Sequence, residues 1–79
     1  MNKDHFVEWL QAQKGFDLKS SRDVMSRLNR ATKFVNLSNK TDIEMLIFKL
    51  SSNAEFKMLN PCVKSQLKRA LRLADEFGR

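Results

Sequence analysis

The sequence lacks most of the side chains on which enzyme active sites depend. It has no tyrosine, one histidine and one cysteine (Cys62), and neither a glycine-rich phosphate loop nor a G-x-S-x-G turn. A zinc site needs several cysteine or histidine ligands, so we expect no metal site, and nothing in the sequence indicates a cofactor. No histidine or acid lies near Cys62 in sequence, which favours a packing role over a nucleophilic one. We therefore expect no catalytic residue and no enzymatic activity.

Other shortages limit the class of protein. Two glycines and one proline in 79 residues argue against disorder. The longest apolar run, residues 45–48, is far shorter than a membrane span, so we expect no membrane association. A single cysteine excludes an internal disulfide and no signal peptide is recognisable, which indicates a cytoplasmic protein. The length predicts one domain, residues 1–79.

Positive charge is present in excess but is unevenly distributed. The net charge is +6. Residues 21–40 hold five bases and one acid, and residues 61–79 hold five bases and two acids, whereas bases and acids balance in residues 1–20 and acids exceed bases by one in residues 41–60. A localised basic surface favours a polyanionic partner, nucleic acid before membrane. The simpler interpretation is a solvated surface that aids solubility.

Helical spacing of apolar residues runs through the chain, and no alternating pattern of strand type occurs. The spacing predicts four helices and one short turn, at residues 2–13, about 21–35, about 42–51, 53–58 and 61–77. We therefore predict an all-α fold, an orthogonal bundle of four helices in two helical hairpins.

Local signals set the expected helix ends. Gly15 and Gly78 are natural left-handed C-terminal caps. Asn60 followed by Pro61 is a strong helix start. We expect Ser20 or Ser21 to start the second helix, with Ser20-x-x-Asp23 as a capping box, and residues 41–44 (Thr-Asp-Ile-Glu) to form a capping box for the third.

One pattern occurs twice, 39 residues apart. Residues 24–31 and 63–70 both read V-x-S-x-L-x-R-A. Amphipathic patterning alone could produce this match, and so could a chain built from two similar hairpins. In either case two long basic helices dominate the molecule.

Both basic helices carry cations and short polar groups opposite their apolar stripes. Arginine and lysine neutralise phosphates, and serine and asparagine can donate to phosphate oxygens or reach base edges. No aromatic residue is interleaved on these faces, which favours duplex backbone contacts over single-strand stacking. Arg27 lies off this face, toward Phe34, where its stem can pack. The predicted nucleic-acid-binding residues are Arg22, Ser26, Asn29, Arg30, Lys33, Ser65, Lys68, Arg69 and Arg72.

The helix at residues 42–51 is apolar nearly all round, since Met45 and Phe48 lie opposite its main apolar stripe. Such a helix is either sandwiched in the core or shared with a partner. In so small a domain we expect the sandwich and a monomer; exposure of Met45 and Phe48 would instead predict self-association. With Trp9, these two residues form the candidate surface for a protein partner.

The order of elements resembles the N-terminal, SAM-like core-binding domain of tyrosine recombinases and phage integrases. The residues that carry the resemblance are Phe6-x-x-Trp9-Leu10, Leu18-Lys19-Ser20-Ser21, residues 28–35 with Phe34, the helix after Thr41, and residues 67–77. The resemblance implies a helical bundle whose two long helices face double-stranded DNA. The family's catalytic domain is absent, and a chain without tyrosine cannot supply its nucleophile.

We therefore expect a non-enzymatic module that contacts duplex DNA phosphates through its two basic helices. The alternative is a small protein-interaction module, a regulator or inhibitor of phage or plasmid type, that binds an acidic or apolar partner surface.

Overall fold

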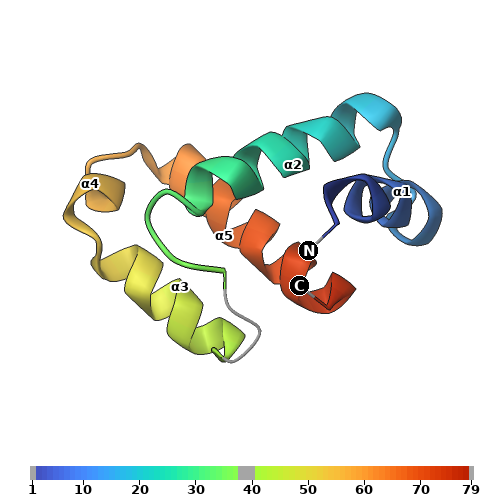
Figure 1. Ribbon diagram of the computed structural model, residues 1–79. Coiled ribbons are helices and arrows are strands. Elements are labelled where there is room, and N and C mark those ends of the chain that lie inside the picture. The colour runs from blue at the N-terminus through green and yellow to red at the C-terminus, as the bar shows by residue number, and fades with distance from the viewer. Residues whose placement is uncertain (1, 38–40, 79) are drawn as a thin grey trace.

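The computed structural model describes residues 2–37 and 41–78, which form five helices (Figure 1). They are α1 (Lys3–Lys14), α2 (Leu18–Ala31), α3 (Ile43–Ser52), the single turn α4 (Ala54–Lys57) and α5 (Pro61–Phe77). None of the described residues lies in a strand. The predicted all-α fold with four main helices and one short turn is confirmed.

The predicted ends of α1 and α5 are confirmed. Gly15, with φ of 69°, ends α1, and its amide donates to the carbonyl of Leu10. The side chain of Asn60 accepts a 2.9 Å hydrogen bond from the amide of Val63, and Pro61 occupies the first helical position, where a missing N–H costs nothing. Gly78, with φ of 102°, ends α5. Both glycines have backbone conformations that other residues rarely adopt.

The predicted bounds of α2, about 21–35, are wrong by three residues at the start and four at the end, since the helix runs from Leu18 to Ala31. Asp17 is the N-cap, and its carboxylate accepts a 2.7 Å hydrogen bond from the amide of Ser20. Hydrogen bonds from the backbone and the side chain of Ser20 lower the pKa of Asp17 below its ordinary value. Ser20 and Ser21 lie inside the helix, so the predicted capping box does not form. Ser21 is fully buried, and its Oγ has no hydrogen-bond partner among the described residues.

The helix α3 also begins one residue later than the predicted capping box requires. Asp42 is its N-cap and makes no side-chain capping hydrogen bond. The short helix α4 has a better start, because the side chain of Asn53 accepts from the amide of Phe56.

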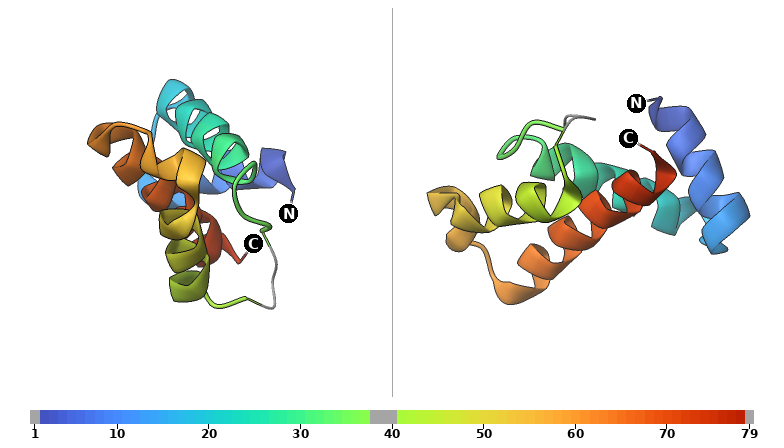
Figure 2. Two further views of the ribbon diagram at one scale, coloured as in Figure 1. Left: turned by 90° about the vertical axis from the view of Figure 1, so that its left-hand side faces the viewer. Right: turned by 90° about the horizontal axis from the view of Figure 1, so that it is seen from below.

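The core lies around the pair α2 and α5, which run side by side in opposite directions (Figures 1 and 2). At one end of this pair α1 crosses steeply, and at the other end α3 and α4 pack against it. Trp9 and Phe77 bring the ends of the chain together, with ring centroids 5.5 Å apart. The buried apolar residues are Phe6, Leu10, Val24, Met25, Leu28, Ala31, Val35, Leu46, Leu50, Phe56, Leu67, Ala70, Leu71, Leu73 and Ala74.

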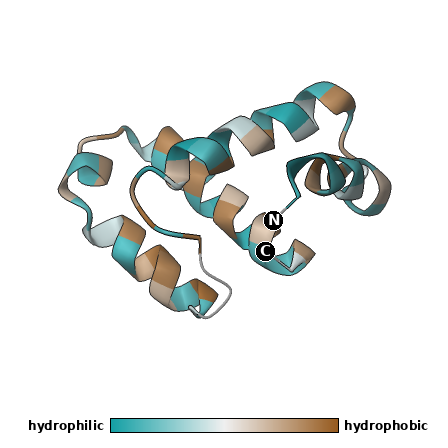
Figure 3. Ribbon diagram, viewed as in Figure 1, coloured by the Kyte–Doolittle hydropathy of each residue, from teal (hydrophilic) through white to brown (hydrophobic). Residues whose placement is uncertain are grey.

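The prediction that α3 is sandwiched in the core is wrong. Leu46 and Leu50 are buried, but Met45 is 50% exposed and Phe48 is 66% exposed. Figure 3 shows apolar colour on the visible side of α3, while the visible side of α2 is mainly hydrophilic. The other helices therefore cover only one side of α3.

In the described part of the chain, no helix combines the length and hydropathy needed to cross a membrane.

Candidate nucleic-acid interface

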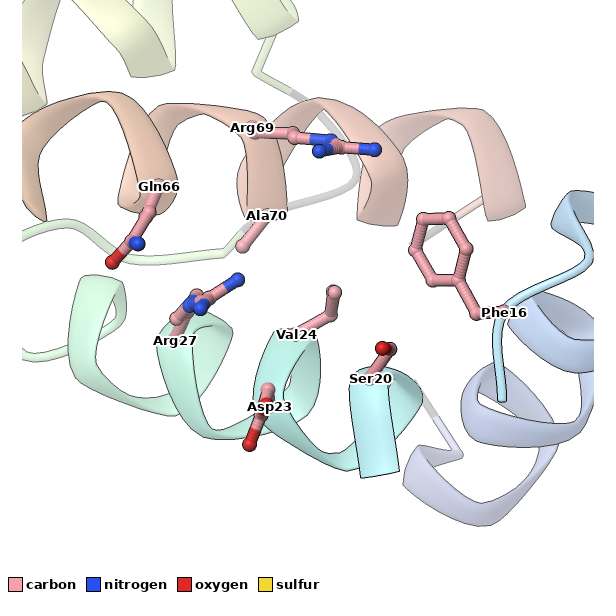
Figure 4. Close-up of a pocket in the computed structure, with 8 residues that line it drawn as sticks. All are labelled: Phe16, Ser20, Asp23, Val24, Arg27, Gln66, Arg69 and Ala70. Carbon is pink, nitrogen blue, oxygen red and sulfur yellow. The ribbon is translucent and has the colours of Figure 1, made fainter. Parts of the chain in front are cut away.

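A groove of about 210 Å³ runs between α2 and α5 (Figure 4). The buried residues Val24 and Ala70 form its floor. Polar side chains stand on both sides, and Phe16, from the segment between α1 and α2, closes one end. The lining residues are Phe16, Ser20, Asp23, Val24, Arg27, Gln66, Arg69 and Ala70.

Two arginines from different helices share this groove. Arg27 of α2 is half-buried, and in Figure 4 its guanidinium lies in the groove, on the side toward Val24. Arg69 of α5 is exposed, and its guanidinium carbon lies 5.5 Å from the ring centroid of Phe16. Gln66 reaches from α5 toward α2 (Figure 4). The groove therefore has cationic and amide donors on both walls.

Among the described residues, no carboxylate forms an ion pair with the arginines that line the groove. The ion pairs within residues 2–37 and 41–78 join Lys14 to Glu76 and Arg72 to Glu44. Neither Arg27 nor Arg69 has a described carboxylate within 4.0 Å. Asp23, four residues before Arg27, points away from α5 in Figure 4.

The sequence repeat explains why the two helices present similar residues to one groove. Arg27 and Gln66 are equivalent positions of the repeat, and both line the groove from opposite walls. Arg30 of α2 is the position equivalent to Arg69, and it is exposed but does not line the groove. We call Arg27 and Arg69 the groove arginines.

The other predicted residues of α2 lie elsewhere on its surface. Arg22 and Ser26 line a hollow between α1 and α2, together with the acids Asp4 and Glu8. Successive helix residues point 100° apart, so Ser26 and Arg27 face different neighbours. Asn29 lines a third hollow, with Lys3 and Thr32, and Lys33 is exposed in the turn after the helix.

On α5, three of the four predicted residues have partners within the domain, one of them being Arg69 at the ring of Phe16. The Nη1 atom of Arg72 donates a 3.0 Å hydrogen bond to Glu44. The ammonium of Lys68 lies 5.9 Å from the ring centroid of Phe56. Ser65 is exposed. The structure thus brings Arg69, but not all four residues, to the groove.

The predicted protein-partner surface is divided. Met45 and Phe48 lie together on α3, but Trp9 lies on α1 at the other end of the molecule (Figures 1 and 2). The Trp9 ring packs against Phe6 and Phe77, and the ammonium of Lys14 lies 5.6 Å from its centroid. Trp9 thus belongs to an aromatic cluster that holds α1 to α5.

Sequence reasoning missed five groove residues besides the apolar Val24 and Ala70: Phe16, Ser20, Asp23, Arg27 and Gln66. For Arg27 and Gln66 the repeat carried a signal, because they are equivalent positions of it. Cys62 was expected in the core, but it is exposed near the start of α5. No cluster of three possible metal ligands occurs in the described ranges.

Comparisons with known proteins find no relative: no protein-family model matches the chain, and neither a curated protein nor a solved structure matches it. The resemblance to core-binding domains of tyrosine recombinases stays a prediction that rests on the sequence pattern.

Proposed function

We propose that this domain binds the backbone of double-stranded DNA through the groove arginines and has no catalytic activity of its own. The observation that carries the proposal is the groove itself. Two basic helices lie side by side there, and neither groove arginine has a described carboxylate within 4.0 Å. An arginine that is not paired with a carboxylate is available for bidentate contact with a phosphate.

The neighbouring groups suit the same ligand. The hydroxyl of Ser20 and the amide of Gln66 can donate to phosphate oxygens. Phe16 is the one aromatic residue that lines the groove, and the guanidinium of Arg69 already lies near its ring. A single-strand site would instead need exposed aromatic faces for successive bases. The groove therefore favours duplex phosphates.

Salt dependence is the first test. Contact between two arginines and two phosphates predicts a slope of about −1.8 for log affinity against log salt. The affinity for duplex DNA should then fall roughly twelvefold between about 50 and 200 mM salt. Fluorescence anisotropy with a labelled duplex of arbitrary sequence measures this. No binding at low salt would contradict the proposal.

The matched variants Arg27→Glu and Arg22→Glu locate the interface. They make the same charge change on the same helix, but only Arg27 lines the groove between α2 and α5. We expect Arg27→Glu to weaken binding about tenfold or more and to flatten the salt slope by about one. Arg22→Glu should have a much smaller effect.

Circular dichroism checks that both variants keep the helical fold. Equal losses of affinity would mean that overall charge alone attracts DNA. A larger loss of affinity from Arg22→Glu than from Arg27→Glu would contradict the groove. It would indicate instead that DNA binds the outer face of α2, with Ser26, Asn29 and Lys33.

Protein binding remains the second candidate function. The exposure of Met45 and Phe48 favours protein binding. The protein partner would contact α3 rather than the groove.

A further inference from the structure

The outer face of α3 carries four side chains in an ordered stripe. Glu44, Met45, Phe48 and Lys49 are all exposed. With 100° per residue, their order around the helix is Glu44, Phe48, Met45, Lys49. Two apolar groups thus lie in the centre, with an acid on one flank and a base on the other.

This stripe has the spacing of a two-stranded parallel helix pair. Met45 and Phe48 are three residues apart, like the a and d positions of a heptad, and Glu44 and Lys49 then fall at the flanking g and e positions. When two such helices lie parallel about a two-fold axis, the acid flank of each faces the basic flank of the other. We propose that α3 mediates a symmetric dimer, in which Met45 and Phe48 of two copies pack together and Glu44 of each copy pairs with Lys49 of the other.

Charge favours a second copy at this place. The chain has a net charge of +6, so two copies repel one another in general. Residues 41–60 are the segment in which acids outnumber bases, by three to two. An approach through α3 therefore meets the least repulsion. An isologous contact joins the same surface of both copies. The outer face of α3 carries both an acid and a base, so it can pair with the same face of a second copy.

The internal contacts of Glu44 leave it free to take part. Its hydrogen bond to Arg72 uses Oε1, and the two side chains are 67% and 52% exposed. Exposed ion pairs of this kind contribute little to stability, so Glu44 can turn toward Lys49 of the other copy at small cost.

The contact is small, and this sets the expected strength. Stable interfaces bury about 1,200 Å² or more, and two apolar residues per copy bury much less. The dimer should therefore be weak, and the dimeric fraction should increase with protein concentration. Sedimentation equilibrium from about 10 µM to 1 mM should show a rise from monomer mass toward dimer mass. A constant monomer mass over this range would overturn the proposal.

Phe48→Glu should abolish this rise, because it places a charge in the centre of the contact. Met58→Glu is the matched control, since Met58 is 86% exposed and lies outside α3. An equal loss from both variants would mean that association comes from general apolar exposure, which contradicts a specific α3 contact.

Charge reversal tests the parallel register. Glu44→Lys and Lys49→Glu should each weaken the dimer about fivefold, and the double variant should restore it, because each single change converts attractive pairs into repulsive ones. Net charge alone predicts another result, since Glu44→Lys raises it to +8 and Lys49→Glu lowers it to +4. Opposite effects of the two single variants, or no recovery in the double variant, would overturn the register.

Discussion

The helices α2 and α3 differ in how clearly their sequences separate an inner side from an outer side. In α2, polar and apolar residues lie on separate sides, and the apolar side faces α5 and α1. In α3 apolar residues occur nearly all round, and the structure buries Leu46 and Leu50 while it exposes Met45 and Phe48. When polar and apolar residues lie on separate sides of a helix, the sequence predicts which side is buried. When apolar residues lie nearly all round, the packing of the neighbouring helices determines which side is buried.

The largest expected effect concerns stability. Leu28 and Leu67 are each 1% exposed and occupy equivalent positions of the repeat. Truncation of either to alanine should cost about 2–5 kcal/mol, as for other buried leucines. Phe48→Ala, on the exposed side of α3, should change the free energy of unfolding by less than about 0.5 kcal/mol.

Urea denaturation followed by circular dichroism compares the three variants. A large loss of stability from Phe48→Ala would show that α3 buries its outer face after all. Small losses from both leucine variants would show that the central packing of α2 on α5 has been assigned wrongly.

The sequence predicted helix ends well where one residue type was decisive. Gly15, Gly78 and the pair Asn60-Pro61 each have few conformational alternatives. It failed at the start of α2, where Asp17 and Ser21 are both acceptable N-caps and only three-dimensional packing selects between them. In the structure Asp17 is the N-cap, and Ser21 lies buried one turn inside the helix.

The candidate site was predicted only in part. Arg69 was identified because it lies opposite the apolar stripe of α5. Arg27 was missed because it lies between the polar face and the core, and only the position of α5 shows that this flank borders a groove. A single helix does not reveal which flank faces its neighbour.

The stability of the folded protein should depend weakly on pH through Asp17, the N-cap of α2. The pKa of Asp17 is lowered by hydrogen bonds from Ser20, so the ionised group stabilises the folded state. This contribution is complete above the ordinary pKa of 3.8 and is lost as the pH falls through the lowered folded value.

The variant Asp17→Asn keeps a good N-cap residue but does not titrate. Thermal unfolding of the two proteins between about pH 6 and pH 2.5 isolates the contribution of Asp17, because the other carboxyl groups titrate in both. The advantage of the wild-type protein over the variant should shrink as the pH falls. A constant difference would contradict the capping role of the Asp17 carboxylate.

Amide and arginine side-chain NMR shifts during a titration with duplex DNA test the central claim most directly. The groove arginines and the amides beside them on α2 and α5 should shift first and most at low salt, while α1 and the outer face of α3 stay unchanged. Shifts centred on Arg22 and Ser26 would contradict the groove as the interface, and so would shifts spread evenly over all lysines and arginines.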